Sequence, residues 1–106
     1  MNKKQQTFYE VRANVIKAMA HPTRLFIVDN LAESDLCVND LTKKIGADMS
    51  TVSKHLSILK NAGIVQTRKE GTQVYYNLKM PCILNFFGCV ESVLKTTSTE
   101  QLLQIR

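Results

Sequence analysis

The chain lacks the hydrophobic segments that would tie it to a membrane or to an export route. None of its apolar runs approaches roughly 18 residues, the length that a helix needs to cross a bilayer. The first ten residues, MNKKQQTFYE, contain no apolar stretch of the kind found in secretory signal peptides. Cysteine is scarce as well, and three cysteines, an odd number in a chain without a signal, argue against a disulfide framework. We therefore expect a cytoplasmic protein with reduced thiols and no membrane partner.

The sequence also lacks the usual signatures of an enzyme. It has no glycine-rich phosphate-binding loop and no pair of carboxylates at helical spacing. His21 precedes Pro22, which suits the first turn of a helix, so we interpret His21 as a residue of a helix junction. Metal ligation by His21 is the less favoured alternative. We expect neither catalysis nor a required cofactor.

The positive charge of the chain is concentrated in its middle third. The composition, 44% apolar and 22% charged over 106 residues, is ordinary for one soluble domain. The formal net charge is +5, and residues 41–79 account for all of it, because they hold seven bases against two acids. Such a local excess is the electrostatic feature expected of a nucleic-acid-binding protein.

A helix is predicted in the middle of this basic segment, over residues 48–63 (DMSTVSKHLSILKNAG). Asp48 is suited to cap its start, and Gly63 is suited to the left-handed turn that ends it. At about 100° per residue, three apolar residues share one stripe, which predicts a seam facing the core. These residues are Val52, Leu56 and Leu59.

The opposite face of this helix carries no acid, although a solvated surface helix usually pairs Glu with Lys. It presents short hydroxyl side chains around one cation, namely Ser50, Ser53, Lys54 and Ser57. Short donors let a helix backbone approach phosphates and base edges closely, and lysine adds charge attraction. We interpret this helix as one that lies on DNA.

Further helices are predicted before it. Residues 1–6 are polar and are predicted to form a disordered arm, after which apolar residues recur at helical spacing over 7–20. A second helix is predicted to start at Pro22 and a third over 39–45, with Gly46 in the turn that leads to the middle helix. Two helices joined by so short a turn form a helix-turn-helix.

The pattern changes from helical to alternating after the middle helix. Apolar and polar side chains alternate toward the end of residues 64–79, and Glu70-Gly71 marks a turn, which predicts a β-hairpin. A helix-turn-helix over 39–62 followed by a basic hairpin is a winged helix. The predicted fold is therefore mainly α with a β-hairpin wing, in one domain over 1–106.

The last predicted helix, over residues 81–95, has more apolar surface than packing against so small a domain requires. Two adjacent stripes run along it, one with Cys82, Phe86, Cys89 and Val93, the other with Ile83, Phe87, Val90 and Leu94. Large exposed apolar surfaces on soluble proteins are usually interfaces, so we expect this helix and the first helix to form a homodimer. A further short helix capped by Ser98 is predicted within residues 96–106.

Four segments of the sequence occur in an order that indicates a family. They are KAMAHPTRL (17–25), LCVNDL (36–41), STVSKHL with AGIV (50–65) and GTQVYY (71–76). Together they resemble the ArsR/SmtB family of small bacterial repressors. The resemblance implies a homodimeric winged helix that binds a two-fold, double-stranded DNA operator and is released by an effector. It also implies two recognition helices about 34 Å apart, one turn of DNA.

Within that resemblance, two groups of residues are candidates for DNA contact. The group for the groove is Ser50, Thr51, Ser53, Lys54 and Ser57, and the group for the wing is Arg68, Lys69 and Gln73. His55 projects between the polar face and the core seam of its helix. We expect a half-buried, structural role for His55 rather than contact with a base.

The cysteines are the candidate site for the effector. Cys37 matches the first cysteine of the Cys-Val-Cys-Asp-Leu motif of family members that sense arsenite, antimonite or soft metals, but Asn39 replaces the second. The last helix has no histidine, which argues against the zinc site that other members carry there. Cys37, Cys82 and Cys89 could bind As(III), Cd(II) or Cu(I), or could be oxidised or persulfidated. Cys82 and Cys89 lie about 10 Å apart along one helix, too far for a disulfide with each other, but they could act with the partner subunit, or with Cys37, if packing brings them together.

Two alternatives to a thiol-sensing repressor stay open. In the first, the cysteines are small core residues of a DNA-binding regulator whose effector is not thiol-reactive. In the second, the winged helix is a protein-interaction module. The acid-free face of the middle helix favours DNA over the second alternative, and loss of binding at high salt would favour it further.

Overall fold

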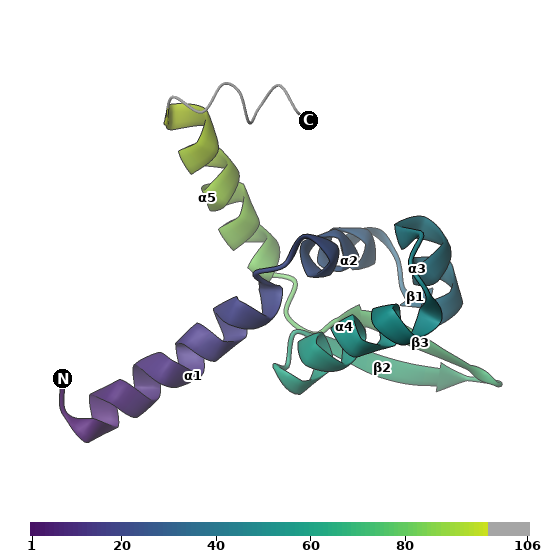
Figure 1. Cartoon of the computed structure of the whole chain (residues 1–106), viewed down its shortest axis with the longest axis horizontal. Helices are drawn as coiled ribbons and strands as arrows, with labels where there is room; N and C mark the ends of the chain where they lie inside the picture. Colours follow the sequence, from purple (N-terminus) through teal and green to yellow (C-terminus); the bar gives the residue numbers. More distant parts are fainter. Residues whose placement is uncertain (98–106) are drawn as a thin grey trace.

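The computed structural model describes residues 1–97 as a helical body with a β-hairpin at one side and two helical arms (Figure 1). In chain order the described elements are α1 (Lys3–Met19), α2 (Pro22–Glu33), β1 (Leu36–Cys37), α3 (Val38–Ile45), α4 (Met49–Asn61), β2 (Val65–Glu70), β3 (Gln73–Leu78) and α5 (Ile83–Thr96). Helices α3 and α4 form the helix-turn-helix, and β2 with β3 forms the wing. The predicted winged-helix fold, mainly α with a β-hairpin wing, is confirmed.

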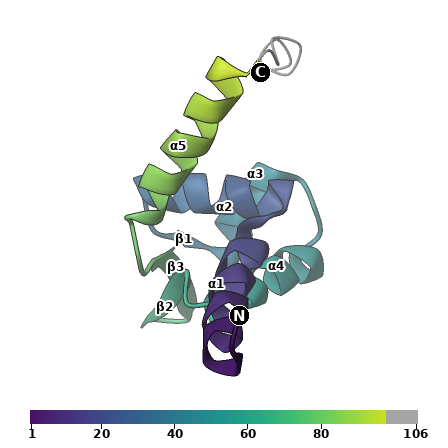
Figure 2. The ribbon, with the colours of Figure 1, turned by 90° about the vertical axis from the view of Figure 1, so that its left-hand side faces the viewer.

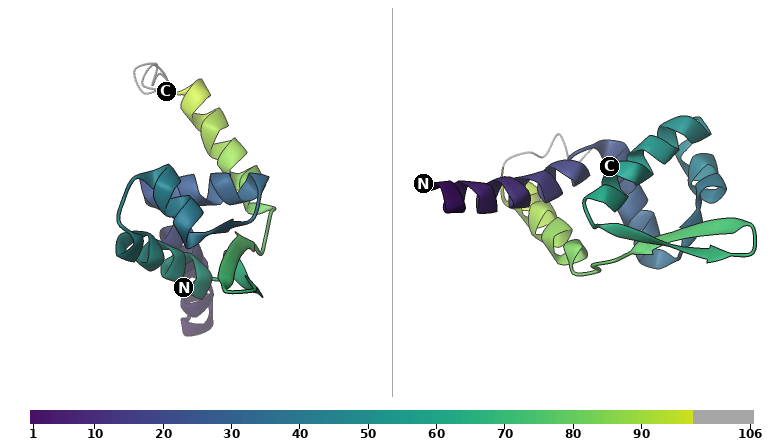
Figure 3. Two further views of the ribbon diagram at one scale, coloured as in Figure 1. Left: turned by 90° about the vertical axis from the view of Figure 1, so that its right-hand side faces the viewer. Right: turned by 90° about the horizontal axis from the view of Figure 1, so that it is seen from below.

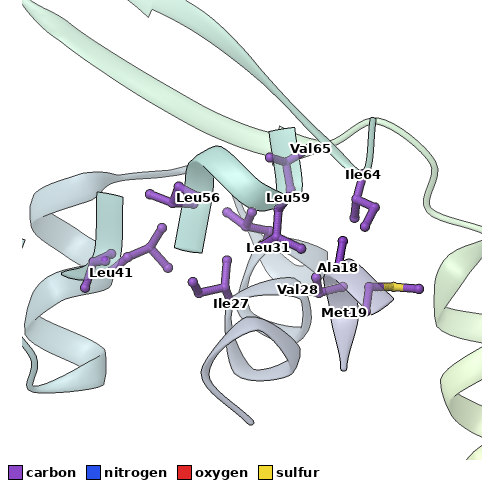
Figure 4. Packing of buried hydrophobic residues seen from close by; sticks show 11 residues of the cluster. Ala18, Met19, Ile27, Val28, Leu31, Leu41, Leu56, Leu59, Ile64 and Val65 are labelled. Carbon is purple, nitrogen blue, oxygen red and sulfur yellow. The ribbon is translucent and has the colours of Figure 1, made fainter. Parts of the chain in front are cut away.

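One hydrophobic core joins α2, α3 and α4 to the end of α1 and the start of β2 (Figure 4). The predicted seam of α4 is confirmed, because Val52, Leu56 and Leu59 have no exposed surface. Burial of an aliphatic side chain of this size favours folding by about 1.5–3 kcal/mol. The apolar side of α4 is therefore held firmly, and its polar side is turned away from the body.

Local signals set the ends of α4. The side chain of Asp48 accepts a hydrogen bond from the backbone N–H of Thr51 at 2.7 Å, which caps the first turn. Gly46 and Gly63, which precede and follow the helix, have φ angles of +78° and +82°. Residues with a Cβ rarely adopt this left-handed conformation, so both turns depend on glycine. The predicted cap and both predicted glycine turns are confirmed.

The wing belongs to a three-stranded antiparallel sheet with the strand order β1-β3-β2. The short β1 pairs Leu36 with Tyr76 and Cys37 with Tyr75, so it covers only part of β3. Strands β2 and β3 pair along their whole length and extend beyond β1 as a ribbon (Figure 3). The outer part of the wing is thus a two-stranded ribbon, a form that is marginally stable by itself.

The prediction of a disordered arm over residues 1–6 is wrong, because α1 begins at Lys3. The side chain of Asn2 accepts the backbone N–H of Gln5 at 2.8 Å, and the side chain of Gln5 accepts the backbone N–H of Asn2 at 3.0 Å. This reciprocal capping box satisfies two donors at the helix start and extends the helix by one turn relative to the prediction.

The other helix ends shift by a residue or two. Helix α3 begins at Val38 rather than at 39, and α5 begins at Ile83 rather than at 81. Pro81 and Cys82 lie in the turn before α5, where the backbone N–H of Leu84 bonds the carbonyl of Pro81. Ser98 and the tail that follows it lie outside the described residues.

Helices α1 and α5 extend away from the body in different directions (Figure 1), and Figure 2 shows α5 rising clear of it. Both arms carry large hydrophobic side chains in contact with solvent: Phe8, Tyr9, Val11, Ile16, Phe86, Val90 and Val93. Within residues 1–97, none of the helices is long and apolar enough to cross a membrane. The apolar surface of the arms is therefore surface that the single chain leaves uncovered.

Candidate nucleic-acid interface

The polar face of α4 is presented to solvent. Because the three seam residues are fully buried, the helix cannot rotate, and the side chains on its other side point outward. Of the five predicted groove residues, Ser53 is half-buried, and the exposed ones are Ser50, Thr51, Lys54 and Ser57. The sequence of α4 contains no acidic residue. The face therefore offers small donors and one cation to an anionic surface.

The residue that caps the start of α4, Asp48, is an anion. Asp48 accepts hydrogen bonds from the backbone of Thr51 and from the hydroxyl of Ser50, at 2.7 Å and 3.0 Å. The bond from Thr51 is the main reason that the pKa of Asp48 lies below its ordinary value. Asp48 is therefore ionised at neutral pH, and Ser50 must exchange its bond to Asp48 before its hydroxyl can donate to DNA.

A small basic cluster orients α4 against the junction of α1 and α2. Arg24 donates from Nε to the carbonyl of Ala18 at 2.5 Å, and its Nη1 lies 3.1 Å from Nδ1 of His55. Arginine is only a donor, so Nδ1 of His55 accepts. The ring of His21, whose Nδ1 accepts the N–H of Thr23, lies 4.5 Å from the ring of His55. The predicted structural roles of His21 and His55 agree with these contacts.

The electrostatics of the cluster favour a neutral His55. Burial of the ring, followed by the charges of His21 and Arg24, lowers the pKa of His55 below 6.5. Arg24 was not among the predicted site residues. The sequence shows an arginine one turn after the predicted helix junction. Its partner, His55, lies 31 residues away in the sequence, so the contact between them could not be read from spacing.

The predicted wing residues have different surroundings. Lys69 and Gln73 are exposed. Arg68 donates to Asp35 at 3.0 Å and to Glu70, and its guanidinium lies 4.8 Å from the ring centre of Tyr75. The structure thus leaves Lys69 and Gln73 facing solvent, whereas Arg68 already has partners within the chain.

The three cysteines do not form one site within the chain. Cys37 is buried at the start of α3, where its Sγ donates to Oδ2 of Asp40 at 3.1 Å. That hydrogen bond is the main cause of the lowered pKa of Asp40. Cys82, in the turn before α5, and Cys89, on α5, are both exposed. Across residues 1–97, no three histidine, cysteine or acidic side chains gather as a metal site would require.

An apolar groove of about 420 Å³ lies where the two arms meet the body. Its lining comes from α1, α2 and α5 and includes Ile16, Met19, Leu25, Phe86, Phe87 and Val90. Phe86 and Val90 are each 44% exposed in the single chain. Asp29 and Glu91 also line this groove.

Comparison with known sequences identifies a regulatory family. The family model described as bacterial regulatory protein, arsR family, matches residues 21–67, which include the helix-turn-helix. The nodulation protein NolR of Rhizobium meliloti is 33% identical over 84 residues, which are 79% of this chain and 69% of that protein. The biofilm growth-associated repressor of Xylella fastidiosa is 39% identical over 66 residues, which are 62% of this chain and 58% of that protein.

A solved structure extends the similarity to nearly the whole described fold. The solution structure of the homodimeric winged helix-turn-helix DNA-binding domain Mb0332 from Mycobacterium bovis superposes with a TM-score of 0.78 at 30% identity. The superposition covers 90% of this chain and 88% of that domain. The agreement includes the arms as well as the body, since the body alone would not reach this coverage.

Proposed function

Because the chain belongs to the ArsR family of bacterial DNA-binding transcription regulators, we propose that it is a homodimeric repressor released from double-stranded operator DNA by a thiol-reactive effector. The observation that carries the DNA-binding part is the exposed, acid-free face of α4, held outward by three fully buried residues. The net charge of +5, confined to residues 41–79, gives this region long-range attraction for DNA.

In this proposal α4 enters the major groove and the wing contacts the flanking backbone. Lys54, Lys69 and Gln73, which are exposed, would make such contacts, and the hydroxyls of Thr51, Ser53 and Ser57 would complete the face. A second copy covers the groove between the arms, which would remove its exposed aromatic and aliphatic side chains from water. The homodimeric state described for Mb0332 supports this arrangement.

The DNA-binding part is tested with two lysines of the same helix. Lys54 lies on the polar face, whereas Lys60 is turned from it by about 120° at 100° per residue. Lys54→Ala should weaken binding to operator and to non-specific DNA alike and lower the slope of log K against log salt by about one unit. Lys60→Ala removes the same charge and should leave that slope nearly unchanged. Equal slopes for both variants and the parent would remove Lys54 from the interface.

The effector is proposed to act through Cys82 and Cys89. Both thiols are exposed in the single chain, and Cys89 lies on α5, which belongs to the proposed dimer interface. Binding of As(III), Cd(II) or Cu(I), or oxidation or persulfidation, would therefore change the packing between the two subunits. Cys37 is the less accessible candidate, because its thiol is buried and donates to Asp40.

The thiol hypothesis is tested by titrating the reduced protein on its own upstream DNA and following fluorescence anisotropy. The reagents are arsenite, Cd(II), Cu(I) and a polysulfide, and the variants are Cys37→Ser, Cys82→Ser and Cys89→Ser. Release by one reagent, abolished in the Cys82 or Cys89 variant, is the expected result. Tight binding that no thiol reagent disturbs would favour the second candidate, a regulator with structural cysteines, which the hydrogen bond between Cys37 and Asp40 also supports.

A further inference from the structure

Arg68 occupies the outer face of the wing, on the side opposite to the helical body. In an antiparallel pair, residues directly opposite each other share a face, and faces alternate along each strand. Arg68 pairs with Tyr75, and its neighbours on the same face, Gln66 and Asn77, hydrogen-bond each other at 2.9 Å. The other face carries Val65, Tyr76 and Leu78, which pack on the core, and it also carries Lys69.

The guanidinium of Arg68 joins the wing to the body. Its Nε donates to Oδ2 of Asp35 at 3.0 Å, and Asp35 immediately precedes β1, at the end of the segment that follows α2. Its Nη1 donates to Glu70 on its own strand, and its plane lies over the ring of Tyr75 on β3. One side chain therefore connects β2, β3 and the entry to β1 across the whole width of the sheet.

The contacts of Arg68 lie where the two-stranded ribbon leaves the three-stranded part of the sheet. Beyond Arg68 and Tyr75, the hairpin residues 69–74 pair only with each other, because β1 reaches no further than Tyr75. A two-stranded ribbon needs support to keep one orientation. The ion pair between Arg68 and Asp35 ties the hairpin to the body close to the point where that ribbon begins.

We propose that Arg68 is a positioning residue for DNA binding, which holds the wing at a fixed angle through Asp35 and Glu70 instead of contacting a phosphate itself. Its two carboxylate partners outweigh its single charge, so the cluster as a whole does not attract DNA. Lys69, on the opposite face of the hairpin, remains to contact the DNA backbone. This inference rests on the proposed DNA-binding function.

Asp35→Asn is the decisive variant because the two possible roles of Arg68 predict opposite signs. The substitution raises the net charge from +5 to +6, which by itself strengthens attraction to DNA. If Arg68 positions the wing, Asp35→Asn should nevertheless weaken operator binding roughly two- to fivefold, the range expected for loss of one exposed ion pair. If Arg68 is a phosphate contact, Asp35→Asn should free it and tighten binding.

Three companion variants sharpen the test. Glu33→Gln makes the same charge change at an exposed acid two residues away that does not contact Arg68, and it should not weaken binding. Arg68→Gln should weaken binding to a similar extent as Asp35→Asn, with the salt slope unchanged. The double variant should be no weaker than Arg68→Gln alone, because both substitutions break one interaction.

Hydrogen exchange of the free protein tests the positioning role without DNA. The amides of residues 69–74 should exchange faster in Asp35→Asn and in Arg68→Gln than in the parent and Glu33→Gln. Unchanged exchange, a salt slope lowered by about one unit in Arg68→Gln, or tighter binding by Asp35→Asn would each overturn the inference. If the parent binds no DNA at all, the proposed function fails, and the exchange rates alone decide whether Arg68 holds the wing.

Discussion

At the scale of single residues, His55 shows how the fold holds α4 in place. The residue lies on α4, between the buried seam and the exposed polar face, and accepts a hydrogen bond from Arg24 at the start of α2. This bond requires the neutral ring, because a protonated imidazole has no acceptor nitrogen. The contact between α4 and the α1–α2 junction therefore depends on the protonation state of His55.

Acidification should weaken this contact. The pKa of His55 in the folded protein lies below 6.5, so as the pH falls through 6.5 the unfolded chain binds a proton before the folded chain does. The free energy of unfolding should then decrease between about pH 7.5 and pH 5.5. The carboxylates of Asp40 and Asp48, whose pKa values are lowered from 3.8, stay ionised in this window and contribute nothing to the change.

The control for this prediction is His55→Gln, which has an acceptor oxygen but no titration. Urea denaturation at both pH values should show a larger loss of unfolding free energy in the parent than in His55→Gln. An equal loss in the two proteins would assign the pH dependence to groups other than His55.

At the scale of the element, α4 has a buried face and an exposed face, and we expect the first to set stability and the second to bind DNA. Leu56 has no exposed surface, so Leu56→Ala should lower the free energy of unfolding by about 2–5 kcal/mol through lost burial and the cavity left behind. Ser57, its exposed neighbour, can be replaced by alanine at a cost within about 0.5 kcal/mol. Chemical denaturation and anisotropy on operator DNA, measured on both variants, check the separation. A Ser57→Ala protein that lost several kcal/mol of stability would contradict it.

Elements whose signals are local could be predicted from the sequence. The seam, the capping aspartate and the flanking glycines of α4 all lie within 46–63, and the wing follows from alternation around Gly71. The start of α1 was missed although its signal was also local, because the pair Asn2 and Gln5 has the spacing of a capping box.

Contacts between distant segments could not be predicted in this way. The basic charge of Arg68 marked it as a DNA contact, but its partner Asp35 lies 33 residues earlier, and only the sheet register brings them together. Likewise, the thiol of Cys37 is less accessible to an effector because it is buried at the start of α3 and donates a hydrogen bond to Asp40. Spacing in the sequence cannot show that a charge is already paired or that a thiol is covered.

At the scale of the whole molecule, the two arms have apolar surface that the single chain cannot bury. Helices α1 and α5 extend away from the body and from each other, and the groove between them is lined mainly by aliphatic and aromatic side chains (Figure 1). Exposing such a surface to water is unfavourable, so a second copy that places its own arms there would stabilise both chains. The same pairing would set the distance between the two copies of α4.

A charge placed in this groove should therefore separate the subunits. Val90→Glu introduces a carboxylate among Ile16, Phe86 and Phe87, and burying it in the dimer would cost several kcal/mol. Sedimentation should give the 12.0 kDa mass of one chain for this variant and twice that mass for the parent. Val74→Glu makes the same change at an exposed valine of the wing, far from the arms, and should leave the parent mass unchanged.

Loss of the dimer should also be visible on DNA. Two recognition helices about 34 Å apart bind successive major grooves together, whereas a monomer offers only one. Circular dichroism should thus show that Val90→Glu keeps its fold. The variant should lose most of its operator affinity and retain weak non-specific binding through the intact polar face of α4. A variant that sediments as a dimer would show that α5 lies outside the interface. One that sediments as a monomer yet binds operator as tightly as the parent would show that each chain reads DNA alone.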